Sequence, residues 1–334
     1  MTSKIKPAKG AAYARIMGVG GYRPVRVVPN EEILKRIDSS DEWIRSRSGI
    51  ATRHWAGPEE TVAAMSVEAA GKAIADAGID PSQIGAVLVS TVSHFKQTPA
   101  IATEIAHRIG AGNPAAFDIS AGCAGFGYGL TMAKGLVVEG SAEYVLVIGV
   151  ERLSDLTDLD DRSTAFLFGD GAGAVVVGPS DEPAMGPTVW GSEGDKAETI
   201  KQTIAWDVYR EETDVRFPAI TQEGQAVFRW AVFEMAKIAQ QALDQAGITA
   251  EDLDVFVPHQ ANMRIIDSMV KTLKLPESVV VARDVETTGN TSAASIPLAM
   301  ERLLATGAAK SGDTALLIGF GAGLVYAATV VTLP

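Results

Sequence analysis

Two pairs of segments in this chain resemble each other at nearly the same separation. The segment "AGIDPSQIGAVLVSTVSH" (77–94) aligns with "AGITAEDLDVFVPHQ" (246–260), and "LTMAKGLVVEGSAEYVLVIG" (130–149) aligns with "LAMERLLATGAAKSGDTALLIG" (298–319). Both pairs lie 168 to 170 residues apart. Two matches at one separation indicate an internal duplication, which limits the fold to those built from two similar halves. We expect the halves to span residues 1–178 and 179–334, with the polar segment 179–230 as a connector and insertion.

Each half alternates helical and strand-like segments. The first half has a helical pattern that ends at a glycine, followed by apolar runs; these segments are 66–79, 85–93, 142–151 and 172–178. The second half repeats the plan with a helix, a strand, a helix and two closing strands; the first three are 231–248, 253–259 and 298–307. Helices that alternate with apolar, β-branched strands predict an α/β protein with largely buried sheets.

The composition excludes several classes of protein. The 334 residues carry a formal net charge of -12, which argues against a general surface for nucleic acid or anionic membranes. No uninterrupted apolar run reaches the ~18 residues that span a bilayer. The amino-terminal stretch lacks the apolar core of a secretory signal. We therefore expect a cytoplasmic protein that binds neither nucleic acid nor membrane.

The chain has one cysteine, Cys123, within the glycine-rich stretch "ISAGCAGFGYG" (119–129). A single cysteine forms no internal disulfide, which fits a reducing compartment. The expected helix over 124–139 places Cys123 at its amino end, where free N–H groups and the helix dipole favour the thiolate. A nucleophile and a small buried core residue are both consistent with this residue taken alone.

Among the four histidines, His259 has the most informative position. It follows an apolar strand and precedes a helix, and the carboxyl ends of strands are where α/β sheets bind ligands. A histidine there can transfer a proton or hydrogen-bond a substrate carbonyl. We expect His107 to lie on a helix surface or in packing, and His54 and His94 lie near turns without an evident partner.

The stretch "GNTSAAS" (289–295) occupies the place in the second half that matches Cys123 in the first. Pseudo-twofold halves would bring these two helix starts together at the centre of the molecule. Asn290 either caps its helix or donates a hydrogen bond to a developing oxyanion. The glycine-lined stretch "IGFGAGLVYA" (318–327) is either a hairpin turn or a source of backbone N–H groups for the same oxygen.

Two other glycine-rich stretches lack a nucleotide-binding signature. "FGDGAGA" (168–174) is not followed by the Lys-Ser/Thr of a phosphate loop, and "GVGGYRP" (18–24) lacks the G-x-G-x-x-G spacing. We interpret both stretches as turns between strands.

Taken together, "SAGCAGFGYGL", "VPHQANMRI", "GNTSAAS", "LFGDGAGA" and "GFGAGL" closely resemble β-ketoacyl-(acyl carrier protein) synthase III, the initiating condensing enzyme of fatty-acid synthesis. The resemblance runs from "GVGGYRP" to the carboxyl terminus. It implies the thiolase fold, in which two duplicated halves form five layers, α-β-α-β-α, and it implies a homodimer.

The resemblance also implies a catalytic triad of Cys123, His259 and Asn290. Cys123 would accept the acyl group of an acyl-CoA, with the backbone N–H groups of Cys123 and Gly321 as the oxyanion hole. Malonyl-acyl carrier protein would then lose CO₂, while His259 and Asn290 hold its thioester carbonyl. Acyl-CoA is a substrate in this scheme, and no cofactor or metal is implied.

The same resemblance implies residues for the other binding steps. The implied CoA-binding residues are Trp43, Arg47, Arg162 and Asn262, with Trp43 and Arg162 on opposite faces of the adenine. A basic patch is expected to dock the carrier protein, and its residues are Arg229, Arg264, Lys271 and Lys274. The alternative is that these residues only form a solvated helix face. Thr98 stands where acetyl-preferring members carry a bulky aromatic at the floor of the acyl pocket, which suggests room for longer or branched starters.

Several rival functions remain open on the sequence. A thiolase needs a second catalytic cysteine, which this chain lacks. Elongating synthases use two histidines, whereas Asn290 holds the second place here, and plant-type polyketide synthases are longer. The close alternative is a starter-unit ketosynthase or acyltransferase of a secondary-metabolite (polyketide) pathway. A cysteine hydrolase and a non-catalytic interaction protein are the more distant alternatives.

Overall fold

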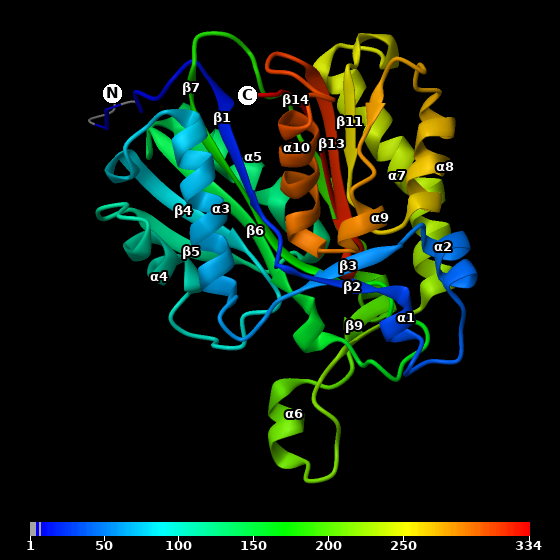
Figure 1. Cartoon of the computed structure of the whole chain (residues 1–334). Helices are drawn as coiled ribbons and strands as arrows, with labels where there is room; N and C mark the ends of the chain where they lie inside the picture. Colours follow the sequence, from blue (N-terminus) through cyan, green and yellow to red (C-terminus); the bar gives the residue numbers. More distant parts are fainter. Residues whose placement is uncertain (1–4, 7) are drawn as a thin grey trace.

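The structure is a computed structural model that describes residues 5–6 and 8–334, and its two halves each build a five-stranded sheet (Figure 1). The first sheet has the strand order β1 (Tyr13–Tyr22), β7 (Asp170–Ser180), β6 (Tyr144–Arg152), β4 (Ile84–Ser90) and β5 (Ala115–Ile119). The second has the order β8 (Val189–Gly191), β14 (Val325–Thr332), β13 (Thr314–Gly321), β11 (Val255–Pro258) and β12 (Val280–Val281).

The two sheets share one pattern of strand directions. In the first sheet β5, β4 and β6 are parallel, and β7 and β1 continue the sheet antiparallel. In the second sheet β12, β11 and β13 are parallel, and β14 and β8 continue it antiparallel. This repetition of order and direction is the duplication expected from the sequence. The boundary expected after residue 178 falls near the end of β7, and it stays a prediction.

Helices separate and cover the two sheets to give five layers (Figure 1). The outer face of the first sheet is covered by α3 (Val62–Ala77) and α4 (Ile101–Arg108), and that of the second by α7 (Gly224–Ala246) with α8 (Met263–Leu273) packed beside it. Between the sheets lie α5 (Gly125–Glu139) and α10 (Ser295–Ala305). The expected α-β-α-β-α arrangement is confirmed.

Local sequence explains where these helices begin and end. The Thr61 hydroxyl accepts a hydrogen bond from the Ala64 N–H at the start of α3, and Gly78 ends the helix with φ +67°. The turn after α3 carries an Asp80/Gln83 capping box, and the turn after α7 carries a Thr249/Asp252 capping box at the equivalent place. Both halves therefore stop a helix and start a buried strand by the same chemistry.

The interpretation of "GVGGYRP" and "FGDGAGA" as turns is wrong. Most of each stretch lies in a strand, and the two strands β1 and β7 pair with each other, for example Gly20 with Ala174. The glycines allow helices to approach the sheet from both sides. A Cβ on Gly18 would lie 2.4 Å from the carbonyl oxygen of Ala73 in α3, and one on Gly173 would lie 2.6 Å from the Pro297 side chain in α10.

Shorter elements complete the chain. They are β2 (Arg26–Pro29), α1 (Asn30–Ile33), α2 (Asp41–Ser48), β3 (Thr52–Trp55), β9 (Ile200–Gln202), α6 (Trp206–Glu211), β10 (Ile220–Gln222) and α9 (Val285–Thr288). The segment that holds α6 projects from the body of the molecule (Figure 1). Among the described residues, no helix is both long enough and apolar enough to cross a membrane.

Candidate active site

The helix starts of the two halves meet at the centre of the molecule. The single turns η2 (Gly122–Ala124) and η6 (Ser292–Ala294) lead into α5 and α10 and contact each other. A Cβ on Gly149 of β6 would lie 2.1 Å from the Ala293 carbonyl oxygen, and one on Gly319 of β13 would lie 2.9 Å from that of Cys123. Each helix start is therefore pressed against the central strand of the opposite half, as pseudo-twofold halves require.

A cavity of about 720 Å³ opens at this junction; we call it the inner cavity. Its lining includes Cys123, His259 and Asn290, which come from three separate segments of the chain. The structure thus brings together the three residues that the sequence singled out as catalytic.

Cys123 is half-buried and opens on the inner cavity. Burial raises the pKa of its thiol to about 12, and the nearby Ser292 side chain acts in the opposite direction. The helix start was expected to favour the thiolate, but burial outweighs that effect, so the thiol rests protonated. The proton must leave during nucleophilic attack.

Gly321 lies directly against this thiol. A Cβ built on Gly321 would be 2.8 Å from both Cβ and Sγ of Cys123, so any larger residue would displace the cysteine. Its φ is 177°, an extended conformation. The close approach brings the backbone of β13 to the side of the nucleophile, where the oxyanion hole was expected.

His259 is buried, with 2 % of its surface exposed. Its Nδ1 lies 2.7 Å from the Ser295 hydroxyl, and its ring packs edge-on against Phe320 at 5.3 Å between ring centres. Burial lowers the pKa of His259 to about 3, so the imidazole is neutral at physiological pH. If Ser295 donates to Nδ1, the ring proton sits on Nε2 and can be donated to a ligand oxygen.

Asn290 precedes η6 and lines the inner cavity. Its Oδ1 accepts a hydrogen bond from the Ser292 N–H at 2.8 Å, and its backbone N–H donates to the Leu167 carbonyl at 2.9 Å. The capping interpretation and the donor interpretation are therefore compatible. With Oδ1 engaged, Nδ2 is the polar atom left for a ligand.

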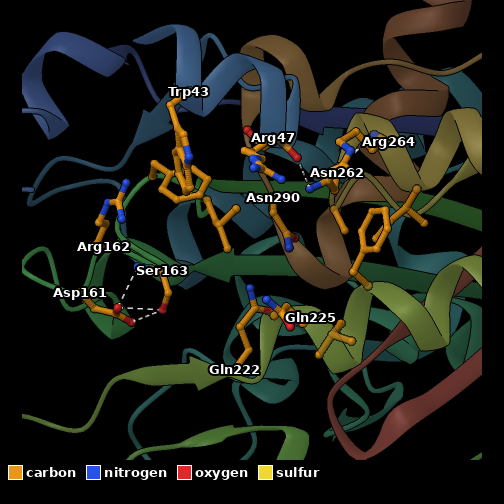
Figure 2. A pocket seen from close by; sticks show the side chains of 18 of the residues that line it. Trp43, Arg47, Asp161, Arg162, Ser163, Gln222, Gln225, Asn262, Arg264 and Asn290 are labelled. Carbon is orange, nitrogen blue, oxygen red and sulfur yellow. Dashed lines mark hydrogen bonds between the residues drawn. The ribbon is translucent and has the colours of Figure 1, made fainter. Parts of the chain in front are cut away.

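A second cavity of about 880 Å³ opens toward the surface beside the first; we call it the outer cavity (Figure 2). The two cavities adjoin, because five residues line both: Gln222, Val227, Ala261, Ile265 and Asn290. All four expected CoA-binding residues line the outer cavity: Trp43, Arg47, Arg162 and Asn262. The expected CoA-binding residues therefore lie next to the cavity that holds the thiol.

Two of these residues already contact each other. The Arg162 guanidinium lies over the Trp43 ring at 4.9 Å from its centre. An adenine held between two such groups needs a spacing of about 7 Å, which is two van der Waals contacts. Arg162 and Trp43 must therefore separate before a base can enter between them.

Asn262 also has structural partners of its own. It caps α8 by accepting from the Arg264 N–H at 2.9 Å, and its Nδ2 donates to the Arg47 carbonyl at 2.9 Å (Figure 2). It thus links the two elements that form one wall of the outer cavity. One amide hydrogen of Nδ2 remains for a ligand.

The expected docking residues divide into two groups. Arg229 and Arg264 line the outer cavity, and the Arg264 guanidinium lies 4.8 Å from the ring centre of Phe228. Lys271 in the last turn of α8 and Lys274 just after it are exposed and do not line this cavity. The structure therefore places two of the four residues at the entrance.

Thr98 is exposed and is not among the described residues that line the inner cavity, although the nearby Gln97 and Ala100 are. The sequence-based role of Thr98 in the acyl pocket stays a prediction.

Sequence reasoning missed several residues at the site. His94 lines the inner cavity and lies four residues after the end of β4, whereas His259 directly follows β11. Phe320 precedes Gly321, and Ser292 and Ser295 lie inside the "GNTSAAS" stretch. The carboxyl end of β4 was a usable signal for His94. No sequence signal distinguished the two serines from helix caps.

The five-layered fold and the cavity at its duplicated centre define the class of thiolase-fold acyltransferases, and comparison with known proteins agrees. Residues 117–194 match the family description "3-Oxoacyl-[acyl-carrier-protein (ACP)] synthase III", and residues 243–333 match its C-terminal counterpart. The chain is 83 % identical to "Beta-ketoacyl-[acyl-carrier-protein] synthase III 1" of Streptomyces coelicolor, over 99 % of this chain and 100 % of that protein. The protein belongs to the β-ketoacyl-(acyl carrier protein) synthase III family.

More distant relatives show the same fold. A mycobacterial β-ketoacyl-[acyl-carrier-protein] synthase III from Mycobacterium marinum is 54 % identical over 99 % of both chains. The crystal structure of a priming β-ketosynthase from the R1128 polyketide pathway superposes with a TM-score of 0.97, at 48 % identity and 99 % coverage of both chains. The synthase III of Aquifex aeolicus superposes with a TM-score of 0.88, at 37 % identity, over 96 % of this chain and 99 % of that one. The thiolase fold is thereby confirmed.

Proposed function

We propose that the protein condenses a short-chain acyl-CoA with malonyl-acyl carrier protein to give 3-oxoacyl-acyl carrier protein, CoA and CO₂, and so initiates fatty-acid synthesis. One observation carries the proposal. Cys123, His259 and Asn290 line a single cavity that shares part of its wall with the outer cavity, where Trp43 and Arg162 lie.

In the first stage, Sγ of Cys123 attacks the thioester carbonyl of the acyl-CoA, and CoA leaves. The backbone N–H groups of Cys123 and Gly321 are proposed to hold the oxyanion. The contact between Gly321 and the thiol supports this role, because it brings that backbone to the reacting carbon. One such donor typically contributes a factor of about 10²–10³ in rate.

In the second stage, malonyl-acyl carrier protein loses CO₂, and the resulting enolate attacks the acyl-cysteine. His259 and Asn290 are proposed to donate hydrogen bonds to the malonyl thioester oxygen as it gains negative charge. The low pKa of His259, caused by burial, supports this role, because a neutral imidazole with its proton on Nε2 is a donor that transfers no proton. Asn290 supplies a second uncharged donor at Nδ2.

The CoA moiety is proposed to occupy the outer cavity. Its adenine would insert between Trp43 and Arg162, and its pantetheine arm would pass Asn262 on the way to Cys123. The basic residues Arg47, Arg229 and Arg264 at this entrance suit both the CoA phosphates and an acidic carrier protein, on a chain whose net charge is -12. Lys271 and Lys274 extend the same basic surface along α8.

The protein is further proposed to act in the cytoplasm as a homodimer, with acyl-CoA as a substrate and with neither metal nor cofactor. Among the described residues, no group of three or more His, Cys, Asp or Glu is arranged to hold a metal ion.

A starter-unit role in polyketide synthesis is the second candidate. The R1128 priming β-ketosynthase, at 48 % identity and a TM-score of 0.97, supports it. The relatives named β-ketoacyl-[acyl-carrier-protein] synthase III from Streptomyces species, at 83 % and 84 % identity, favour the fatty-acid role. Rates with fatty-acid and polyketide carrier proteins from the same organism separate the two.

The Asn290→Asp variant tests the division of labour in this mechanism. Aspartate keeps the oxygen that accepts from the Ser292 N–H but removes the Nδ2 donor. We expect acylation by acyl-CoA to stay within a few-fold of wild type, and release of CO₂ from malonyl-acyl carrier protein to fall about 10²–10³-fold. Radiolabelled CO₂ and the mass of the acyl-enzyme report the two stages separately.

Equal losses in both stages would contradict the role assigned to Asn290. A free acid as the main product of wild type, with no 3-oxoacyl-carrier protein, would contradict the condensation itself and indicate a hydrolase.

A further inference from the structure

A fully buried carboxylate lies behind the nucleophile, and the mechanism above does not use it. Glu151 is on β6 and has no exposed surface. Its carboxylate accepts hydrogen bonds from the Ser93 hydroxyl at 2.6 Å, the Thr91 hydroxyl at 3.3 Å and the Val92 N–H at 3.1 Å. The adjacent Arg152 turns away and pairs with Asp155 at 3.0 Å. Glu151 is thus held by neutral donors only.

Ser292 lies beside both this carboxylate and the thiol. Its side chain is near enough to lower the pKa of the Cys123 thiol and of the Glu151 carboxylate, and η6, which carries it, contacts both η2 and β6. Glu151 is also close enough to Cys123 for its charge to raise the pKa of the thiol. The Ser292 hydroxyl is therefore the group placed to pass a proton between Sγ and the buried carboxylate.

The backbone of Ser292 shows that its side chain is retained at a cost. Ser292 has φ +47°, in the left-handed region, where a non-glycine residue is strained by about 1–2 kcal/mol. Gly122 occupies the equivalent place in the first half, 170 positions earlier, with φ +48°. A glycine at position 292 would adopt this φ without strain. The presence of serine therefore indicates that its hydroxyl has a role that outweighs the strain.

The same comparison of halves singles out Glu151. Its equivalent in the second half, 170 positions later, is Gly321, which lies against Cys123. The first half therefore has glycine at 122 and a carboxylate at 151, whereas the second half has a hydroxyl at 292 and glycine at 321. Glu151 and Ser292, which stand where the other half has glycine, lie near each other beside the only thiol in the chain.

We propose that Glu151 receives the Cys123 thiol proton through the Ser292 hydroxyl when the thiol attacks an acyl thioester. The inference rests on the proposed function, because it assigns a path for a proton that this function must move. The groups that hydrogen-bond Glu151 are two hydroxyls and one N–H from the segment 91–93 after β4. The Ser292 hydroxyl and the Cys123 thiol lie near it, and the thiol is the titratable one among these groups.

The proton balance closes over the two stages. As Sγ forms its bond to the acyl carbon, its proton passes to Oγ of Ser292, and the Ser292 proton passes to Glu151. CoA leaves as a thiolate and takes a proton from solvent. In condensation the C–S bond to Cys123 breaks, and the thiolate recovers a proton from Glu151 by the reverse path. One solvent proton is consumed per turnover, as decarboxylative condensation requires.

His259 is poorly suited to take this proton. Burial lowers the pKa of His259 to about 3, so its protonated form is strongly disfavoured, and the proposed second stage needs its proton on Nε2. Burial raises the pKa of Glu151 to about 7, which makes it a better base than an ordinary carboxylate. The two buried groups therefore suit different stages.

The pH profile of Glu151→Gln tests the proposal. Two probes are used, acylation by isobutyryl-CoA and alkylation by iodoacetamide, both followed by intact mass between about pH 5 and 9. In wild type we expect both rates to show a rise centred near pH 7 as the carboxylate forms, on top of the steady increase that thiolate formation gives at every pH in this range. In Glu151→Gln this rise disappears, and acylation at pH 8 falls about 10²-fold.

A second variant keeps the test decisive if Glu151→Gln does not fold. Ser292→Gly removes the bridging hydroxyl while relieving the strain at φ +47°, so it is expected to fold and to lose the same rise. Asp170→Asn is the matched control, because Asp170 is another buried carboxyl with a pKa raised by burial, to about 6, and its partners are Ser154 and Ala56. It should retain the rise with pH.

The proposal is overturned if the rise near pH 7 persists in folded Glu151→Gln or in Ser292→Gly. It is also overturned if Asp170→Asn abolishes the rise equally. Failure of the proposed function looks different: wild type would be alkylated by iodoacetamide at Cys123 but would not be acylated by isobutyryl-CoA.

Discussion

At the scale of single residues, burial rather than charge pairing sets the state of this site. Cys123 and His259 are both neutral at rest, since burial raises the pKa of one to about 12 and lowers that of the other to about 3. Because no ion pair forms at rest, the hydrogen-bond donors of the site are free to stabilise the negative charge of an oxyanion or enolate when it forms. The sequence predicted both residues, but it could not predict their protonation, which depends on neighbours from several distant segments.

Glu151→Gln should change the pH dependence of stability. The pKa of Glu151 is 4.5 for a free side chain and about 7 when folded, so the folded state binds an extra proton between these values. The free energy of unfolding of wild type should therefore fall as pH rises through that window, by on the order of 3 kcal/mol from this group. Glutamine does not titrate, so the variant should gain stability over wild type by this amount between about pH 4.5 and 7.

Urea unfolding of both proteins at pH 5 and pH 8 measures this difference. The opposite contribution of His259, whose stabilisation is lost as pH falls from 6.5 toward 3, is common to both and cancels. An unchanged stability difference at the two pH values would show that Glu151 is not held with a raised pKa.

At the scale of elements, the sequence predicted the helices and strands that have a clear hydrophobic period and local end signals. The helices α3 and α10 and the strands β4, β6, β11, β13 and β14 lie where their patterns placed them, within a few residues. Helix α7 was expected from residue 231, but it begins at Gly224, within the segment interpreted as a connector. The glycine-rich parts of β1 and β7 were mistaken for turns, because the reason for their glycines lies in α3 and α10. The residues of "GVGGY" do not by themselves indicate that a helix packs on this strand. The projecting segment around α6 was likewise foreseen only as an insertion.

The start of α8 should contribute to recognition of the carrier protein. Arg264→Glu reverses a charge at the entrance of the outer cavity, and we expect the KM for malonyl-acyl carrier protein to rise about fivefold to tenfold at low salt. The effect should shrink as salt is added, because the contact is at a solvated rim. Steady-state kinetics over a salt series measures both.

Lys310→Glu is the control for this prediction. Lys310 is exposed near the start of β13, whereas the site lies at the far end of that strand, roughly 20 Å away. An equal rise in KM in the control would assign the effect to overall charge and not to docking at α8.

At the scale of the whole molecule, duplication explains both the fold and the location of the site. Two similar halves bring η2 and η6 together, and this single inference from the sequence linked Cys123 to Asn290 across the chain. The symmetry is broken at Ser292 and Glu151, where the other half has glycine, and these are the two residues to which we assign transfer of the thiol proton. The sequence alone could not indicate a function for these two differences between the halves. Only the folded chain places the Ser292 and Glu151 side chains beside the Cys123 thiol.

The most direct test of the proposed chemistry is the site and fate of the acyl group. After incubation with isobutyryl-CoA, the mass of the protein should increase by one acyl group, and the group should map to the peptide that contains Cys123. Addition of malonyl-acyl carrier protein should remove it with release of one CO₂ and formation of 3-oxoacyl-carrier protein, and Cys123→Ala should form no adduct. An adduct on another residue, or one that leaves as a free acid, would contradict the proposed condensation at Cys123.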